Sequence, residues 1–261
     1  MNNQLISNYY SAQHSLKQTS NHFKISIYMV KKALRETGTP IRSRKEQNII
    51  TNMNRTMKVN EDYFDLLNAE NVYYLGFLAA DGCVHPNRNE IKIGLSSIDE
   101  DWMITFKQDL GIERDIKKYL TTKGFEVVEI CFSSAKIKEA LAKYDIVPNK
   151  TFKEISIKNI PDNLKIHYIR GFFDGDGSFS WNKNTRQGMV KIVSHKENIL
   201  KEIQSIMGGT IYHFKDRNLY SLEYSTLPSI DFLNKIYQND SRCLVRKKLK
   251  YYEFLNFRIQ I

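Results

Sequence analysis

Two aspartates occupy the same place in two similar stretches of the chain, and their pairing would suit phosphate chemistry. The segments VYYLGFLAADG (72–82) and HYIRGFFDGDG (167–177) match in length, in apolar pattern and in a terminal Asp-Gly. Each pattern predicts a helix whose last turn carries the aspartate, Asp81 or Asp176. A carboxylate there is unfavourable by roughly 0.3–1 kcal/mol, because a helix C-terminus already carries partial negative charge. A divalent cation would offset that repulsion, and Mg²⁺ takes one or two such carboxylates.

Small residues give both helices a face along which they can touch. Gly76 and Ala80 in the first copy, and Gly171 and Gly175 in the second, are four positions apart and share a helix face. Without long side chains, two helix backbones can approach closely through ridge and groove packing. We therefore expect the paired helices to bring the two aspartates together. The glycine after each aspartate is expected to be the left-handed residue that ends many helices.

An ordinary turn is the alternative interpretation of these aspartates, because Asp and Gly dominate turns. An EF-hand loop that starts at Asp174 is excluded, since Ser178 and Thr185 stand where a third ligand and the closing Glu belong. The same helix ending occurs twice, each time with the same small face, and this duplication favours a functional site over a turn.

The sequence after each copy also repeats, which indicates two similar α+β units at 69–160 and 161–261. EIKIGLSSIDED parallels GMVKIVSHKEN, and AKIKEALAKYDI parallels SIDFLNKIYQND. Tyr220, Leu222 and Tyr224 alternate with polar residues, the pattern of a strand with one buried face. Each unit is expected to run helix, hairpin, helix, hairpin, helix, with antiparallel strands.

Residues 1–47 are expected to form a helix-turn-helix, followed by a polar linker or short helix at 48–68. Leu16 begins a helical period that KIS interrupts and that resumes at Ile27. Ser26 is placed to cap the second helix, which in this motif enters the DNA major groove. A plain helical hairpin is the alternative.

This segment resembles bacterial helix-turn-helix modules, but it departs from them at Ser20 and Lys24, where they usually carry Ala and Gly. We expect the lysine to cost little, because its side chain can reach solvent or phosphate. The residues that the resemblance places against DNA are Ile27, Tyr28, Lys31 and Lys32 on the second helix, and Arg42 and Arg44 in the segment that follows.

Composition and charge favour a polyanionic partner. The net charge is +10, and residues 1–60 carry ten Lys and Arg against two Glu. The longest nearly apolar run, 72–80, is far shorter than the ~20 residues of a membrane-spanning helix. With no signal pattern at the N-terminus, we expect a cytoplasmic protein. Three scattered cysteines and six scattered histidines predict neither a disulfide framework nor a zinc site.

The two helix endings resemble the nine-residue motif of the LAGLIDADG homing endonucleases. YLGFLAADG (74–82) and IRGFFDGDG (169–177) are good copies of it, and the resemblance covers about residues 69–261. It implies an α+β fold of two pseudo-symmetric αββαββα units, with saddle-shaped antiparallel sheets packed through the two motif helices. Two motifs in one chain imply a monomer with internal pseudo-twofold symmetry.

The resemblance also implies a function and its residues. The chain would cut both strands of double-stranded DNA at a long asymmetric target, as in intron homing, with two or more Mg²⁺ ions. The eighth motif residues, Asp81 and Asp176, would bind the metal. The sixth is Asp174 in one motif and Ala79 in the other, so Asp174 fits a structural carboxylate better.

Catalytic lysines are expected just after the third helix of each unit, where Lys150 stands in the first unit and Lys247 or Lys248 in the second. Outward strand residues would contact the bases and phosphates. The candidates are Lys92, Lys117, Lys118, Arg186, Lys191, Lys215 and Arg217.

Other functions stay open at this stage. The same scaffold could serve a helix-turn-helix transcriptional regulator or an RNA-splicing maturase. The chain could also be a plain DNA-binding protein whose Asp-Gly pairs only end helices. An intein is disfavoured, because the N-terminus lacks a nucleophile and the C-terminus lacks the usual His-Asn. The helix-turn-helix favours a bacterial or phage setting.

Overall fold

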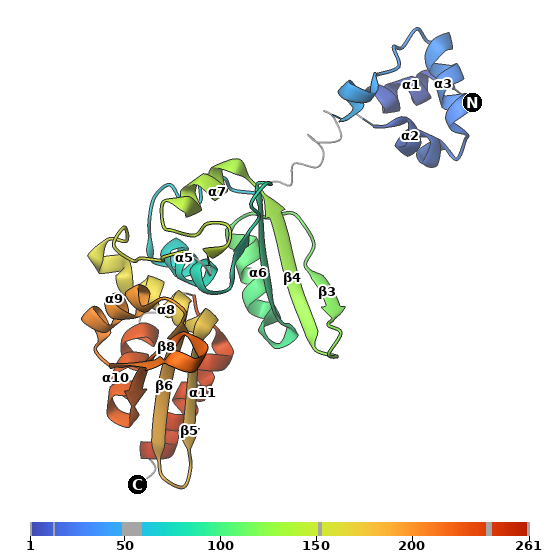
Figure 1. The fold of residues 1–261 in the computed structure, drawn as a ribbon. Coiled ribbons are helices and arrows are strands. Elements are labelled where there is room, and N and C mark those ends of the chain that lie inside the picture. Colours follow the sequence, from blue (N-terminus) through green and yellow to red (C-terminus); the bar gives the residue numbers. More distant parts are fainter. Residues whose placement is uncertain (1, 13, 49–58, 151–152, 239–241, 260–261) are drawn as a thin grey trace. The chain divides into compact units, whose positions relative to one another are not determined.

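The computed structural model describes residues 2–12, 14–48, 59–150, 153–238 and 242–259 (Figure 1). The chain divides into two compact units, Met1–Met57 and Lys58–Ile261. Among the described residues, no helix combines the length and the apolar composition that crossing a bilayer requires.

The first unit is a small helical bundle. Its helices are α1 (Asn3–Ser11), α2 (Leu16–Phe23) and α3 (Ile27–Glu36). Helix α1, which was not predicted, buries Ile6 and Tyr10 against the α3 residues Val30, Ala33 and Leu34. The three helices thus share one apolar core.

A side-chain cap and a left-handed residue shape the turn between α2 and α3. The predicted cap of α3 is present, because Ser26 Oγ accepts a hydrogen bond from Met29 N at 3.3 Å. Lys24 adopts a left-handed conformation with φ 52°. For a non-glycine residue this conformation costs about 1–2 kcal/mol. The expectation that lysine costs little here was therefore wrong, since it considered only the side chain and not the backbone.

The second unit contains two halves with the same element order. The first half consists of α5 (Ala69–Asp81), β1 (Cys83–Val84), β2 (Glu90–Ser96), α6 (Glu100–Asp109), β3 (Lys117–Leu120), β4 (Glu126–Ser133) and α7 (Ala135–Ala142). The second half consists of α8 (Lys165–Asp176), β5 (Gly177–Asn182), β6 (Gln187–Ser194), α9 (Glu197–Met207), β7 (Thr210–Phe214), β8 (Leu219–Ser225) and α10 (Thr226–Tyr237). The predicted αββαββα pattern and the α+β class are confirmed.

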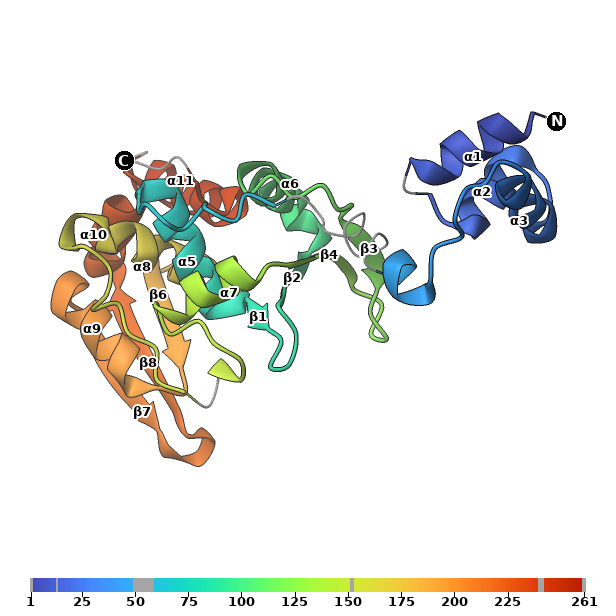
Figure 2. The ribbon, with the colours of Figure 1, turned by 90° about the horizontal axis from the view of Figure 1, so that it is seen from above.

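Each half has one four-stranded antiparallel sheet, in the order β1-β2-β4-β3 or β5-β6-β8-β7. In β2 the side chains of Ile91, Ile93 and Leu95 are buried, and the residues between them are exposed. One face of the sheet therefore packs on the core and the other is open. Helix α5 of the first half and helix α8 of the second lie side by side and form the interface between the halves (Figure 2).

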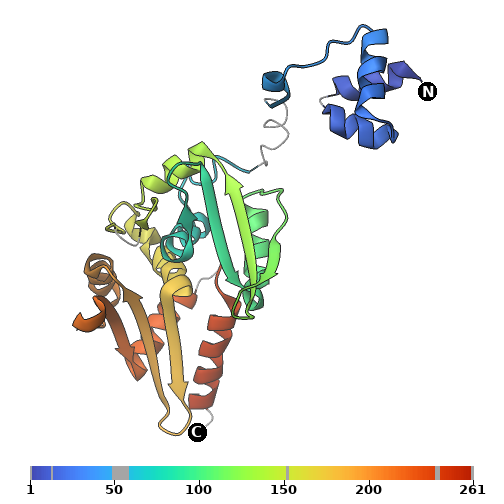
Figure 3. The same cartoon turned by 45° about the vertical axis from the view of Figure 1, so that its right-hand side comes forward.

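A further helix, α11 (Val245–Ile259), follows the second half and was not anticipated. It lies beside β5 (Figure 3). Its Phe254 is buried, with ring centroids 5.5 Å from Phe179 and 5.7 Å from Trp181. This helix closes one edge of the second half and, through its first turn, reaches the end of α8.

The expected linker at 48–68 was too long. The described part, 59–68, belongs to the second unit, because Phe64 is buried in the main core and Tyr63 packs against it. Asn60 N also donates to Leu110 O at 2.8 Å. Aromatic residues in a polar segment were the overlooked signal. Residues 49–58 of the expected linker lie outside the described residues.

Candidate active site at the ends of two paired helices

Helices α5 and α8 meet backbone to backbone. A Cβ placed on Gly76 would lie 2.0 Å from Tyr168 O, and one placed on Gly171 would lie 1.9 Å from Tyr73 O. These two contacts are reciprocal, so the helices cross at a pseudo-twofold axis. Any side chain at either glycine would force the helices apart, and this close approach sets the position of both helix ends.

The two aspartates come together where the helices end. A Cβ on Gly175 would lie 2.3 Å from Ala80 Cβ and 3.4 Å from Asp81 Oδ2. The carboxylate of Asp81 thus lies against the residue that precedes Asp176. Both aspartates keep solvent-accessible surface, although the neighbouring helix ends remove part of their hydration. All four small residues singled out in the sequence line this helix contact.

The glycines after the aspartates are extended and not left-handed, which corrects the expectation. Gly82 has φ −68° and ψ 148°, and Gly177 has φ −81° and ψ 159°. Glycine is needed at both positions because a side chain would clash. A Cβ on Gly82 would lie 2.6 Å from Leu78 O, and one on Gly177 would lie 2.2 Å from Phe173 Cδ2. The chain therefore passes directly from each helix into β1 or β5.

The electrostatics of the pair favour a cation. Lost solvation, and then repulsion by Asp81, raise the pKa of Asp176 to about 6. Lost solvation also raises the pKa of Asp81, against the opposing effect of Lys150 and Lys247. Within the described part of the chain, neither carboxylate accepts a hydrogen bond. The negative charge at this place is therefore incompletely balanced by the protein.

Each helix end carries a lysine on its last carbonyls. Lys150 Nζ donates to the carbonyl oxygens of Ala79, at 2.6 Å, and Ala80. Lys247 Nζ donates to the carbonyl oxygens of Phe173 at 2.8 Å, Asp174 at 2.7 Å and Gly177 at 2.5 Å. A cation is favourable at a helix C-terminus. The two predicted lysines thus occupy equivalent places beside the two aspartates.

Lost solvation lowers the pKa of both lysines, to about 8 for Lys247, although the nearby aspartates raise it. Lys248, the alternative to Lys247, lies elsewhere on α11, with its Nζ 5.5 Å from the ring centroid of Tyr252. It follows that Lys247 and not Lys248 stands at the site.

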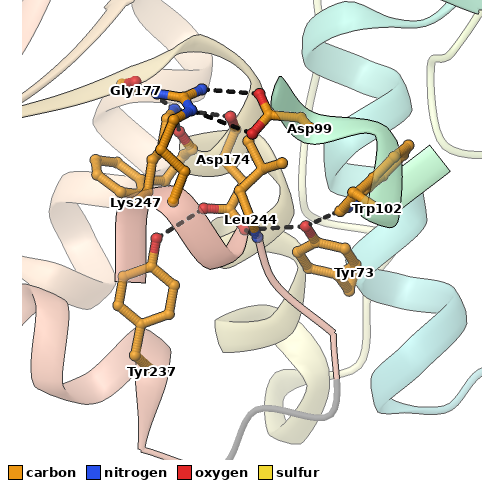
Figure 4. Close-up of polar contacts among 10 residues, drawn as sticks. Tyr73, Asp99, Trp102, Asp174, Gly177, Tyr237, Leu244 and Lys247 are labelled. Carbon is orange, nitrogen blue, oxygen red and sulfur yellow. Dashed lines mark hydrogen bonds and ion pairs between the residues drawn. The ribbon is translucent and has the colours of Figure 1, made fainter. Parts of the chain in front are cut away.

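Asp174 is a buried structural carboxylate, only 1% exposed. It accepts hydrogen bonds from Tyr73 OH at 2.9 Å, Tyr237 OH at 2.7 Å and Leu244 N at 2.7 Å (Figure 4). All of its partners lie far from it in sequence, so the sequence carried no signal for them.

A cavity of about 270 Å³ adjoins the site and is lined by Asp176, Lys150, His195 and Lys196, among others. The last two were missed, because a single His-Lys pair has no distinguishing pattern in the sequence. Across the described ranges, no three His, Cys, Asp or Glu side chains gather into a metal cage. A cation at the aspartate pair would therefore need further ligands from water or a phosphate, which suits Mg²⁺.

In the first sheet, the predicted DNA contacts lie on opposite faces. Lys92 and Lys117 are on the open face, where Lys92 Nζ is 2.5 Å from Glu129 Oε2. Lys118 is opposite the buried Val128, so its side chain lies on the helix-covered face and pairs with Glu100 at 2.7 Å. Strand alternation thus removes Lys118 from the group of open-face residues.

In the second sheet, Lys191 lies on the open face, 2.9 Å from Glu223. The other three candidates are exposed and lie between strands. Arg186 is in the β5–β6 hairpin, and Lys215 and Arg217 are in the β7–β8 connection. Arg217 pairs with its neighbour Asp216 at 3.4 Å.

In the first unit, the candidate residues of α3 share an exposed face, and Tyr28 is 71% exposed. That face consists of Ile27, Tyr28, Lys31 and Lys32. Arg44 is also exposed, but the guanidinium of Arg42 is already hydrogen-bonded inside the unit. Its guanidinium donates to Tyr10 O at 2.6 Å and His14 O at 2.7 Å, so this arginine joins the helices of the unit.

The comparisons with known proteins agree with this fold. Residues 163–221 match the family model of the LAGLIDADG-like domain. The structure of I-LtrWI, a LAGLIDADG homing endonuclease bound to target DNA, is similar, with TM-score 0.52 and 14% identity over 77% of this chain and 91% of that one. The meganuclease I-AabMI bound to uncleaved DNA gives TM-score 0.52 and 14% identity over 73% and 90%. No curated protein matches in sequence.

Proposed function

We propose that this chain, which carries a LAGLIDADG-like domain on the LAGLIDADG two-sheet fold, is a site-specific double-strand DNA endonuclease. One observation carries the proposal. An aspartate from each half stands at the meeting point of two helix ends, and each has a lysine beside it. Two equivalent half-sites suit the hydrolysis of one phosphodiester in each strand. Because both aspartates belong to one chain, a monomer suffices.

The aspartate pair fits a divalent cation such as Mg²⁺, since it offers two hard oxygen donors that the protein leaves poorly balanced. Asp81 and Asp176 would hold the metal against the scissile phosphate. When bound, divalent metal lowers the pKa of an attacking water and stabilises the leaving oxygen.

The lysines would act on the charge of the phosphate. A phosphodiester resists attack because its negative charge repels nucleophiles. Lys150 and Lys247 hold their ammonium groups in partly desolvated places beside the aspartates. In such a place a cation stabilises developing negative charge more strongly than it would in water.

The open faces of the two sheets would follow the major groove, where base edges carry a distinct pattern for each pair. Lys92, Lys117 and Lys191 are the cations placed there. Two of the three pair with a glutamate on the same face, so they are oriented before DNA arrives. The first unit would add contacts at one flank through α3.

A cleavage selection tests the proposal. The full chain is incubated with a randomised duplex library and Mg²⁺, and the cut ends are sequenced to define the target. Asp81→Asn and Asp176→Asn should each lower the cleavage rate at least ~10³-fold, the order expected when transition-state charge stabilisation is lost. Both variants should bind the same duplex in Ca²⁺.

Asp231→Asn is the matched control, because this exposed aspartate lies on α10 and, within the described ranges, pairs with Lys235 one turn away. It should cut as the natural chain does. Target binding without any cutting in Mg²⁺ would contradict the endonuclease proposal and favour the regulator alternative.

A further inference from the structure

The two halves of the site hold their lysines by different means. Lys150 lies in the segment after α7 and contacts the carbonyls at the end of α5. Lys247 lies in the first turn of α11, which has no counterpart among the described residues of the first half. The equivalent positions on the paired helices also differ, since Asp174 in α8 corresponds to Ala79 in α5. A buried carboxyl group thus stands at this position of α8, and a methyl group stands at the equivalent position of α5.

Asp174 fixes the start of α11. Its Oδ2 accepts from Leu244 N, which immediately precedes the helix, and from Tyr73 OH of the other half. Its Oδ1 accepts from Tyr237 OH at the end of α10 (Figure 4). Tyr73 OH is itself held by Trp102 Nε1 at 2.8 Å. Because three donors share this buried carboxylate, its orientation is fixed, and the backbone position of Leu244 is fixed with it.

A second carboxylate holds the same turn from the first half. Arg246 Nε and Nη2 donate to the two carboxylate oxygens of Asp99, at 3.1 and 2.9 Å. Asp99 is only 7% exposed and precedes α6. A bidentate pair of this kind fixes orientation as well as distance. Lys247, which follows Arg246, therefore extends from a turn that is held on both sides.

We propose that Asp174 is a positioning residue for Lys247, and that it makes cleavage of one DNA strand, but not the other, depend on the start of α11. This inference rests on the proposed endonuclease function. Without the carboxylate, Leu244 N and two tyrosine hydroxyls lose their acceptor, and the first turn of α11 loosens. Lys247 Nζ then leaves the carbonyls at the end of α8, whereas Lys150 keeps its contacts at the end of α5.

Strand-specific kinetics test this inference. The selected target is labelled differently on each strand, and the rate of each cut is followed in Mg²⁺. Lys247→Met and Lys150→Met first establish which strand each lysine serves. Asp174→Ala should then slow the Lys247 strand by ~10–100-fold, the cost of a misplacement near 1 Å, and the other strand by less than ~3-fold. A duplex nicked in one strand should accumulate.

A double variant separates positioning from a general loss of stability. If Asp174 acts through Lys247, Asp174→Ala with Lys247→Met should cut no more slowly than Lys247→Met alone, since groups that act as a unit are not additive. The inference would be overturned if the double variant lost rate by the product of the two single losses. Equal slowing of both strands by Asp174→Ala would also overturn it. A natural chain that cuts no DNA at all would instead contradict the proposed function.

Two further variants keep the test decisive if Asp174→Ala does not fold. Tyr237→Phe removes one donor to Asp174 and should slow the same strand by a smaller factor. Ser229→Ala removes a buried hydroxyl of the same half whose hydrogen bonds run to Tyr224 O at 2.6 Å, Gly188 O and Val190 N, none of which lies in α11. It should leave the ratio of the two strand rates unchanged.

Amide hydrogen exchange gives a readout that needs no DNA. In the natural chain Leu244 N is bonded to Asp174, and the peptide that spans 243–247 should exchange slowly. Tyr237→Phe, and Asp174→Ala where it folds, should raise that exchange rate, whereas Ser229→Ala should not. If Tyr237→Phe and Asp174→Ala both left the exchange rate of this peptide unchanged, the Asp174 carboxylate would not be what holds the turn.

Discussion

At the scale of single residues, the informative feature is a charge in an unfavourable place. Asp81 and Asp176 end their helices, where the helix dipole repels them, and lost solvation raises the pKa of both. Lys150 and Lys247 contact the helix carbonyls and only partly offset this cost. A protein that needed only two helix ends would not require either carboxylate.

The raised pKa of Asp176 predicts a pH-dependent stability. With a folded pKa of about 6, above the ordinary 3.8, the native state binds the proton more tightly than the unfolded state. Asp176 therefore costs no stability below about pH 4, and its full cost is present above about pH 6. In metal-free protein at neutral pH, Asp176→Asn should raise Tm by roughly 2–4 °C.

Thermal unfolding at neutral pH and near pH 4 checks this, with chelator present. The rise in Tm caused by Asp176→Asn should be smaller near pH 4 than at neutral pH. A lower Tm for the variant at neutral pH would show that the carboxylate stabilises the free protein, contrary to the electrostatics of the pair. Mg²⁺ should stabilise the natural chain more than the variant, because only the natural pair has both ligands.

At the scale of elements, the close crossing of α5 and α8 determines where the aspartates lie. Gly76→Ala would place a methyl group against Tyr168 O, an atom of the backbone that cannot move alone. The substitution should lower the free energy of unfolding by about 3 kcal/mol or more, in line with overpacking of a rigid interface. It should also separate the aspartates and abolish cutting.

Urea unfolding measures the stability loss, and Gly94→Ala is the matched control. A Cβ at Gly94 would meet nothing closer than Val127 Cγ1 at 3.8 Å, so stability should change by less than about 0.5 kcal/mol. Equal effects at the two glycines would mean that α5 and α8 do not touch as described.

The alternation of β3 gives a second prediction at this scale. Lys117 lies on the open face of the sheet, and its neighbour Lys118 pairs with Glu100 on the covered face. Lys117→Ala should weaken DNA binding and make the slope of log affinity against log salt shallower by about 1. Lys118→Ala should leave the slope unchanged. The reverse result would place the DNA on the helix-covered face.

At the scale of the whole molecule, two units with separate cores share one chain. The exposed face of α3 carries an aromatic residue and two lysines, as a DNA-reading helix would. If the first unit binds DNA as proposed, its link to the second unit would make that binding intramolecular and would raise affinity without new chemistry.

Removal of residues 1–57 should therefore weaken target binding at least ~10-fold and flatten its salt dependence, while cutting at high protein concentration persists. The chain with Tyr28→Ala, Lys31→Ala and Lys32→Ala should reproduce most of the loss if α3 is the reading helix. Unchanged affinity of the shortened chain over a salt series would refute a role of the first unit in binding.

The sequence predicted the parts of this fold that repeat, and it missed the parts that do not. The duplicated Asp-Gly helix ends identified α5 and α8, and the strand pattern after each predicted both sheets. Helix α11 has no counterpart in the described part of the first half, so no internal comparison pointed to it. Contacts such as Asp174 with Leu244 and Arg42 with Tyr10 join distant residues, and only the folded chain brings them together.

The most direct test is an anomalous diffraction map from crystals of the full chain bound to its selected duplex and soaked in Mn²⁺. We predict manganese within coordinating distance of both Asp81 and Asp176 and beside the phosphates that are cut. Manganese at other side chains, or an intact duplex with no metal near either aspartate, would contradict a cleavage centre built on the two helix ends.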